Sequence, residues 1–157
     1  MSKITTPTQK TIQAWIQLHH AQRMLLDTVE QSLKDAGLPP LAWYDVLLEL
    51  QRKKRMGLRQ YEIGDKILLN KHNLSRLLDR LEKNGLIDRQ VCKEDGRGNI
   101  IKITDAGEKL MKQIWPVYSK SMQENFGDKL SPDEFVKLNR ILNKVLGRHF
   151  INQSGNE

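Results

Sequence analysis

The strongest constraint on the fold is a change of hydrophobic period inside an otherwise helical chain. Up to Gly85, and again after Thr104, apolar residues recur three, four or seven positions apart, which is the spacing of amphipathic helices. Between these points, residues 87–92 and 100–103 are typical of two short strands, and the glycines of residues 93–99 suit a hairpin tip. The sequence therefore predicts a mainly α protein with one small β-hairpin.

The helices on both sides of this hairpin are bounded by recognisable end signals. Gly37, followed by two prolines, stops the first helix, and Gly85 stops the one before the hairpin. Serine, proline and glutamate at 131, 132 and 134 form a strong start signal for the last helix. The expected helices are 8–36, 41–53, 60–68, 71–84 with Asn70 as its cap, one from Thr104 or Asp105 through Trp115 that Pro116 kinks, and a last one to about His149.

The same spacing predicts which side chains face inward. In the long first helix the apolar positions form one stripe, and each shorter helix has a smaller one. The expected inward residues are Ile12, Trp15, Leu18, Leu25, Val29, Leu33 and Ala36 in the first helix, Val46, Leu47 and Leu50 in the second, Tyr61, Ile63 and Ile67 in the third, and Leu74, Leu77, Leu78 and Leu81 in the fourth.

Positive charge is concentrated in the middle third of the chain. Residues 51–102 hold 14 basic and 7 acidic side chains, whereas residues 1–50 hold 4 and 5, and residues 103–157 hold 8 and 7. A polyanion is the commonest reason to tolerate such local self-repulsion. The distribution favours a nucleic-acid partner, and a basic helical module that meets an acidic protein without sequence-specific DNA binding is the alternative.

Several other classes of protein are not favoured. The chain lacks a glycine-rich phosphate loop and the common hydrolase and metalloprotease motifs, so no enzyme, cofactor or metal site is expected. Its four histidines have no cysteine partners, and Cys92 is the single cysteine. There is no apolar run of the roughly 20 residues that a spanning helix needs and no secretory leader, so a cytoplasmic location without a membrane partner is expected.

Two short helices joined by a tight turn and followed by a basic hairpin form the order of a winged helix-turn-helix. The N-terminal part of the second helix, 71–84, would meet base edges in a major groove about 12 Å wide. Arg76 can contact guanine, Asn73 can contact adenine, and Ser75 can reach a base or a phosphate. Arg80 is expected to reach phosphate or to pair with Asp79 or Glu82. The predicted DNA contacts are Lys71, His72, Asn73, Ser75, Arg76, Arg80, Arg89 and Arg97.

The hairpin tip carries a separate prediction. Arg97 stands between Gly96 and Gly98, so little surrounds it that would block entry into a narrow, A·T-rich minor groove. Asp95 would be repelled by phosphate, and we expect it to hold the turn and to orient Arg97.

Four stretches of the chain closely resemble the MarR family of bacterial transcription regulators. They are 58–63 (LRQYEI), 73–89 (NLSRLLDRLEKNGLIDR), 94–97 (EDGR) and 103–107 (ITDAG), and the likeness extends more weakly to 43–50 and 130–134. The resemblance implies a homodimer that presents two winged helices to a near-palindromic operator in double-stranded DNA, with Arg97 in the minor groove. Gly96 departs from the family, in which many members have a long side chain at this position.

A dimer is also expected from the helices themselves. A winged helix is too small to cover the terminal helices, which leaves Trp15, Leu25, Val29, Trp115, Val117, Tyr118, Phe126, Val136, Leu142 and Phe150 short of partners. We therefore predict a helical dimerisation region at 1–38 and 105–150, a winged helix-turn-helix domain at 41–104, and a disordered tail at 151–157.

The resemblance also implies a way to switch DNA binding. Family members often release DNA when a small aromatic acid or phenol binds between the dimer arm and the winged helix, and this predicts a repressor. The residues expected to line such a pocket are Trp15, His19, Arg23, Trp43 and Trp115, because a cation beside aromatic surface suits a ring carboxylate. Redox sensing through Cys92, between Arg89 and Lys93, is the alternative.

Overall fold

A computed structural model describes residues 5–67, 71–91 and 98–148 of the chain. Within these ranges no helix is both long enough and apolar enough to cross a membrane. The order is α1 (Gln9–Asp35), α2 (Leu41–Arg52), α3 (Gln60–Lys66), α4 (Lys71–Lys83), β1 (Ile87–Val91), β2 (Asn99–Ile103), α5 (Asp105–Asn125), a short 3-10 helix (Gly127–Lys129) and α6 (Pro132–Val145). The fold is mainly helical with one antiparallel hairpin, as predicted from the sequence.

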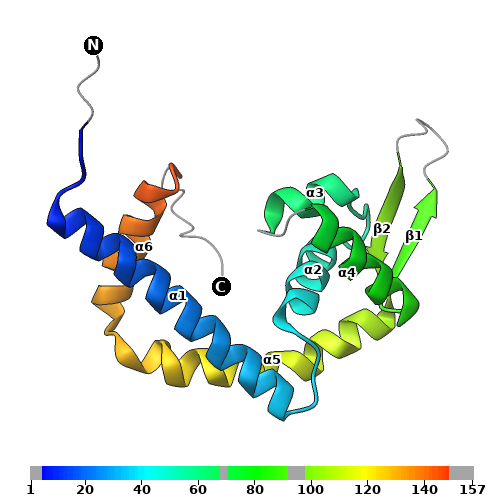
Figure 1. Cartoon of the computed structure of the whole chain (residues 1–157). Coiled ribbons are helices and arrows are strands. Elements are labelled where there is room, and N and C mark those ends of the chain that lie inside the picture. The colour runs from blue at the N-terminus through cyan, green and yellow to red at the C-terminus, as the bar shows by residue number, and fades with distance from the viewer. Residues whose placement is uncertain (1–4, 68–70, 92–97, 149–157) are drawn as a thin grey trace.

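The molecule has two halves, which α5 joins along one edge (Figure 1). One half, which we call the winged-helix half, contains α2, α3, α4 and the hairpin. The other half, which we call the arm, contains α1, α6 and the second part of α5, and α1 packs along α5. Helices α1 and α6, which come from opposite ends of the described chain, therefore lie on the same side of the molecule, away from the hairpin.

The hairpin is extended by a short contact with the segment before α3. Strands β1 and β2 pair in antiparallel register from Ile87 opposite Ile103 to Val91 opposite Asn99. Leu58 bridges Ile101 through two backbone hydrogen bonds, of 2.9 Å and 2.8 Å. Gly57 precedes it with φ at +73°, and a Cβ there would come within 3 Å of the backbone oxygen of Ile101, so only glycine fits. The start of α3 is thereby fixed relative to the hairpin.

The core lies mainly in the winged-helix half. The predicted inward residues of α2 and α4 are buried, namely Val46, Leu47, Leu50, Leu74, Leu77, Leu78 and Leu81. Ile87, Ile101 and Ile103 of the hairpin join them, and Val29 and Leu33 connect the end of α1 to the same cluster. These residues bury their apolar surface within one chain, which stabilises this half without a partner.

Helix α5 begins at the base of the hairpin and continues into the arm. The Thr104 hydroxyl accepts a hydrogen bond from the Gly107 N–H and donates one to the Gly85 carbonyl at 2.6 Å, so the helix start is joined to the end of α4. Pro116 lies inside the helix, which runs on to Asn125, ten residues beyond Trp115. The helix therefore continues past Pro116, and the kink expected at that residue stays a prediction.

Two expectations about helices differ from the structure. Tyr61 was predicted to face inward, but its side chain is exposed because Ile63 fills the inward position of the short helix α3. The long amphipathic helix expected at the start of the chain is present as α1, and in its first half Ile12, Trp15 and Leu18 are exposed in the single chain. Helix α6 ends at Val145, earlier than expected, where Gly147 adopts a left-handed conformation. The predicted cap Asn70 and the tail 151–157 lie outside the described residues.

Candidate nucleic-acid interface

Helix α4 presents a polar face to solvent and an apolar face to the core. Leu74, Leu77, Leu78 and Leu81 are buried, and this orientation leaves Asn73, Ser75, Arg76 and Arg80 on the outside. Lys71 and His72 begin the same helix, but their side chains are outside the described set. Four of the predicted DNA contacts therefore lie on one exposed helix, in the arrangement that a recognition helix requires.

The end of α4 that is expected to meet bases is braced by α3. The Gln60 side-chain amide donates a hydrogen bond of 2.7 Å to the Ser75 hydroxyl, across fifteen residues of sequence. Ser75 can still donate its own hydroxyl proton, because a hydroxyl both donates and accepts. Gln60 was not among the predicted site residues, and only tertiary structure brings it to α4.

Arg89 lies on β1 and faces the second half of α4. Its guanidinium donates a hydrogen bond of 2.8 Å to the Asp79 carboxylate, and its Nε lies 3.4 Å from a carboxylate oxygen of Glu82 without a hydrogen bond to it. The sequence offered these carboxylates as partners of Arg80, with a phosphate contact as the alternative; in the described ion pairs they contact Arg89. DNA contact by Arg89 stays a prediction, and the structure adds that its charge is offset by two neighbouring acids.

The predicted residues of the wing tip cannot be placed. The whole segment 92–97, which includes Cys92, Asp95 and Arg97, lies outside the described residues. This segment lies between Val91, the last residue of β1, and Gly98, which precedes β2. The wing contact of Arg97, the turn role of Asp95 and the redox role of Cys92 therefore stay predictions.

The five residues of the predicted effector pocket do not come together within one chain. Trp15 and His19 are neighbours on α1, with ring centroids 4.6 Å apart, and they line an open depression with Arg23. Trp115 lies on α5, where its ring stacks on that of Tyr44 at 6.1 Å. Trp43 lies on α2 and is half-buried against the core. Three candidates thus lie together on α1, whereas Trp115 lies beside Tyr44 and Trp43 lies on α2.

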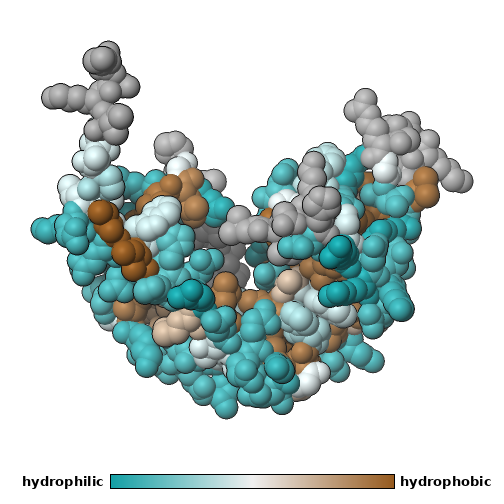
Figure 2. Space-filling view, in the orientation of Figure 1, coloured by the Kyte–Doolittle hydropathy of each residue, from teal (hydrophilic) through white to brown (hydrophobic). Residues whose placement is uncertain are grey.

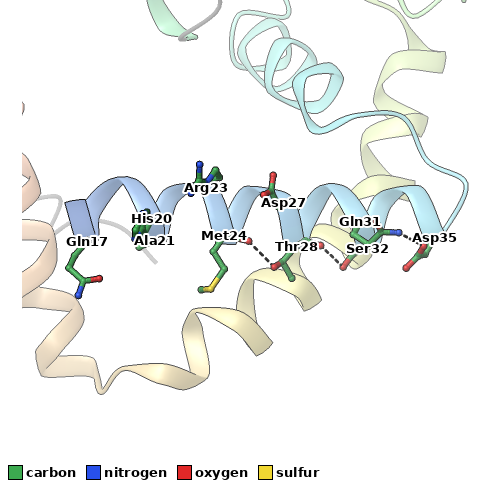
Figure 3. A pocket seen from close by; sticks show the side chains of 10 residues that line it. All are labelled: Gln17, His20, Ala21, Arg23, Met24, Asp27, Thr28, Gln31, Ser32 and Asp35. Atoms are coloured by element: carbon green, nitrogen blue, oxygen red, sulfur yellow. Dashed lines mark hydrogen bonds between the residues drawn. The ribbon is translucent and has the colours of Figure 1, made fainter. Parts of the chain in front are cut away.

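An open hollow along α1 is no ligand pocket in a single chain. It has a volume of about 860 Å³, and every residue that lines it belongs to α1. Figure 3 shows that Arg23 and Asp27 point to one side of the helix, whereas Gln17 and Met24 point to the other. Because these side chains diverge, they cannot converge on one small molecule.

A cluster of aromatic and acidic side chains marks the junction between the arm and the winged-helix half. The rings of Tyr44, Trp115 and Tyr118 pack against one another, and burial raises the pKa of both tyrosines. Burial also raises the pKa of Asp45, with smaller contributions from the nearby carboxylates of Glu30 and Glu49. Glu30 in turn accepts a hydrogen bond of 3.1 Å from the Leu41 N–H at the start of α2.

Metal ligands do not gather in the part of the chain that the structure describes. No group of three or more histidine, cysteine, aspartate or glutamate side chains there has the geometry to hold an ion. This region instead presents the exposed polar face of α4, with the hairpin beside it.

Both a family model and an individual protein match this chain. A family model described as MarR family matches residues 36–98, from the end of α1 to the hairpin. The HTH-type transcriptional regulator MhqR of Bacillus subtilis strain 168 is 30% identical over 138 residues, which cover 88% of this chain and 92% of that protein.

Solved structures share the architecture over nearly the whole chain. Sco3205, a MarR family transcriptional regulator from Streptomyces coelicolor solved in complex with DNA, is 27% identical, with a TM-score of 0.82 over 93% of this chain and 91% of that one. CouR from Rhodococcus jostii RHA1, solved bound to p-coumaroyl-CoA, is 22% identical, with a TM-score of 0.69 over 86% of this chain and 92% of that one. At that identity, the likeness to CouR shows the fold alone.

Proposed function

Because the chain belongs to the MarR family of transcription regulators, we propose that it is a homodimeric repressor of a near-palindromic operator. Members of this family are DNA-binding regulators and not enzymes, and the chain is accordingly a DNA-binding transcription regulator. The proposal concerns the finer points: the dimer, the form of the operator, repression and release by a small molecule.

The observation that carries the proposal is that α6 buries no residue in a single chain. Val136, Ile141, Val145 and Leu146 are each more than half exposed, and on α1 Trp15 is 66% exposed. Figure 2 shows apolar surface on the arm, over α1 and α6. Monomers rarely expose contiguous apolar patches of more than a few hundred Å². A second copy covers such a surface economically, since the same patch meets itself across a two-fold axis.

A two-fold dimer fixes how the two α4 helices meet DNA. Each helix would enter a major groove, and two half-sites on one face of the duplex lie roughly 34 Å apart, one helical turn. Bases would be read by Arg76, Asn73 and Ser75. Phosphates would be contacted by Lys71, His72, Arg80 and Arg89. Arg97 would enter the minor groove, and Asp95 would hold the turn that orients it. Sco3205, which has the same fold, was solved in complex with DNA, and this supports DNA binding by the present chain.

Repression follows from occupancy of the promoter. A dimer that covers roughly 20 base pairs, or two helical turns, excludes polymerase, and a ligand that favours another spacing of the α4 helices weakens binding. We propose a small aromatic carboxylate or phenol as that ligand. Within one chain, Trp15, His19 and Arg23 lie together on α1, apart from Trp43 on α2 and Trp115 on α5. We propose that the partner's arm completes a pocket that uses all five.

The dimer is tested by sedimentation velocity over a range of protein concentrations. The double variant Ile141→Glu with Val145→Glu places charge on the exposed face of α6 and should convert a dimer into a folded monomer with greatly weakened operator binding. The matched control is Lys137→Glu with Arg140→Glu, which changes charged side chains on the same helix. A wild-type chain that stays monomeric both in solution and on DNA would end the proposal.

Operator recognition is tested by selecting bound sites from random DNA, with and without a panel of aromatic carboxylates. We expect a palindromic, A·T-centred site that is preferred over random duplex by roughly 10³-fold or more. Arg76→Ala should relax the preference at one position in each half-site, at a cost of roughly 1–3 kcal/mol, whereas Arg140→Ala on α6 should leave it unchanged. Equal binding of selected and random duplexes at physiological salt would contradict sequence-specific recognition.

A further inference from the structure

The first residue of α3 is hydrogen-bonded to the exposed side of α4. The Gln60 side-chain amide donates a hydrogen bond of 2.7 Å to the Ser75 hydroxyl, and fifteen residues of sequence separate the two. Gln60 is half-buried, whereas Ser75 is exposed. The bond therefore connects the supporting helix α3 to a residue of α4 that is proposed to read a base.

The two helices that carry this hydrogen bond are held together by the core. Ile63, in the middle of α3, and Leu74, next to Ser75, belong to the same buried cluster. The helices approach so closely that a Cβ on Gly64 would lie 3.5 Å from the Leu74 side chain. The two hydrogen-bonded side chains therefore start from a fixed backbone, and ordering them on DNA costs less conformational entropy.

The direction of the bond decides what the Ser75 hydroxyl offers to DNA. A serine hydroxyl has one proton to donate and two lone pairs that accept. Ser75 is the acceptor in its bond with Gln60, so its own proton is directed away from Gln60. Accepting a hydrogen bond also polarises the O–H group and makes it a stronger donor. The contact with α3 thus prepares Ser75 to donate.

The edges of the bases in the major groove respond differently to such a donor. Guanine, thymine and the N7 of adenine present acceptors there, whereas cytosine presents only its N4 amino group, which is a donor. At cytosine the hydroxyl could accept through its second lone pair, but its proton would then lack a partner, which is costly once water is excluded. A donating serine is therefore compatible with three bases and disfavours cytosine.

We propose that Gln60 is a positioning residue that fixes Ser75 as a hydrogen donor, so that the operator excludes cytosine at the base that Ser75 contacts in each half-site. The inference rests on the proposed function, in which Ser75 reads a base in the major groove. It adds a specificity-determining residue that lies outside α4 and that the sequence did not indicate.

The test is the selection of bound sites from random DNA with wild type, Ser75→Ala and Gln60→Leu. Wild type should disfavour cytosine at one position of each half-site by roughly 5- to 10-fold, as expected for one hydrogen bond. Ser75→Ala should abolish this discrimination at that position and at no other. Gln60→Leu has a side chain of similar size without the donor, and it should reduce the same discrimination while thermal unfolding stays unchanged.

Reversing the hydrogen bond gives a sharper measurement. Gln60→Glu replaces the amide donor with a carboxylate that only accepts, so Ser75 turns its proton toward α3 and presents lone pairs to DNA. The preferred base at that position should then change to one with an amino group, cytosine or adenine. The added negative charge also weakens binding to every duplex. Gln51→Glu, at an exposed position near the end of α2, is the control for that general loss and should keep the wild-type base preference.

Three results would overturn the inference while the proposed function stands, because in each of them wild type still selects an operator. The variants of Gln60 could keep the wild-type preference at every position, or they could weaken the preference at all positions equally, as a mere support of α4 would. Gln60→Glu could also exclude cytosine as wild type does. If instead wild type prefers no operator over random duplex, the proposed function fails first, and the role of Gln60 fails with it.

Discussion

The winged-helix half and the arm treat their apolar side chains in opposite ways. In the winged-helix half, the stripes of α2 and α4 are buried against the hairpin, with Leu47, Leu50, Leu78 and Leu81 fully inaccessible. In the arm, α6 has a strong apolar face, but none of its residues is fully buried. A folding unit that completes its own core needs no partner, whereas an uncovered apolar face favours association. In the function proposed here, the half that completes its own core carries DNA recognition, and the arm carries assembly.

The largest expected effect is on the core of the winged-helix half. Leu78→Ala removes a fully buried side chain of α4 and should lower the free energy of unfolding by about 2–5 kcal/mol, through lost burial and the cavity that remains. Leu146→Ala is the matched change at an exposed position just after α6. Leu146→Ala should lower the free energy of unfolding only slightly at high dilution, and by more as the protein concentration rises. Urea unfolding at several protein concentrations measures both effects. If the effect of Leu146→Ala is the same at every protein concentration, the arm does not depend on a partner as proposed.

A second prediction concerns the joint between the two halves. A Cβ on Gly107, in the first turn of α5, would come 2.4 Å from the Leu86 carbonyl oxygen. Gly107→Ala should therefore destabilise the fold by roughly 1–3 kcal/mol, as overpacked sites do. Gly64→Ala in α3 meets only the Leu74 side chain at 3.5 Å, an ordinary contact, and should be neutral or stabilising by up to about 1 kcal/mol, because alanine favours helix. Thermal unfolding should show opposite signs, and two losses of similar size would argue against a tight joint.

A third prediction tests how far local signals hold α6 together. The Ser131 hydroxyl accepts the Glu134 N–H at 3.3 Å, and the Glu134 carboxylate accepts the Ser131 N–H at 3.1 Å. Ser131→Ala should cost about 1 kcal/mol of helix stability, because one end of this capping box is lost. Ser131→Asp keeps an acceptor and should restore it. Helix content by circular dichroism and dimer affinity should fall together in the alanine variant, and a change in neither would show that packing alone fixes α6.

The smallest expected effect is a pH dependence at the junction. Burial, with help from Glu30 and Glu49, raises the pKa of Asp45 in the folded state, so the folded protein takes up a proton at a higher pH than the unfolded chain does. The stability that this adds is fully present below the unfolded pKa and is lost as pH rises through the folded pKa. Asp45→Asn should therefore be more stable than wild type at neutral pH, and the gain should shrink in acid. Asp27→Asn, an exposed change on α1, is the control. A gain for Asp45→Asn that does not vary with pH would contradict this assignment.

The sequence predicted most of the winged-helix half because the signals there are local. Four leucines on one stripe, closed by Gly85, determine both the extent of α4 and its inward face. The change of period after Gly85 likewise located the two strands to within a residue. Such patterns depend on neighbours a few positions away, which the sequence displays directly.

Predictions that depended on a residue far away in the sequence were less successful. Tyr61 was assigned to the core because a seven-residue helix offers too few positions to define a face, and its outward direction follows from packing against the hairpin. Arg89 reaches Asp79 across a turn and a strand, and Gln60 reaches Ser75 from another helix. The five proposed effector residues span both halves, and no periodicity could show that they do not come together within one chain.

Sequence alone determined the helices, the hairpin, the basic middle third and the polar face of α4, since these depend on residue type at short spacing. Tertiary structure decided which polar groups meet: it placed Arg59 and Tyr61 beside the hairpin, paired Arg89 with two acids, and left α6 uncovered. The physical reason is that burial and hydrogen bonding between distant segments depend on how whole elements pack, and packing is fixed only when all of them are in place.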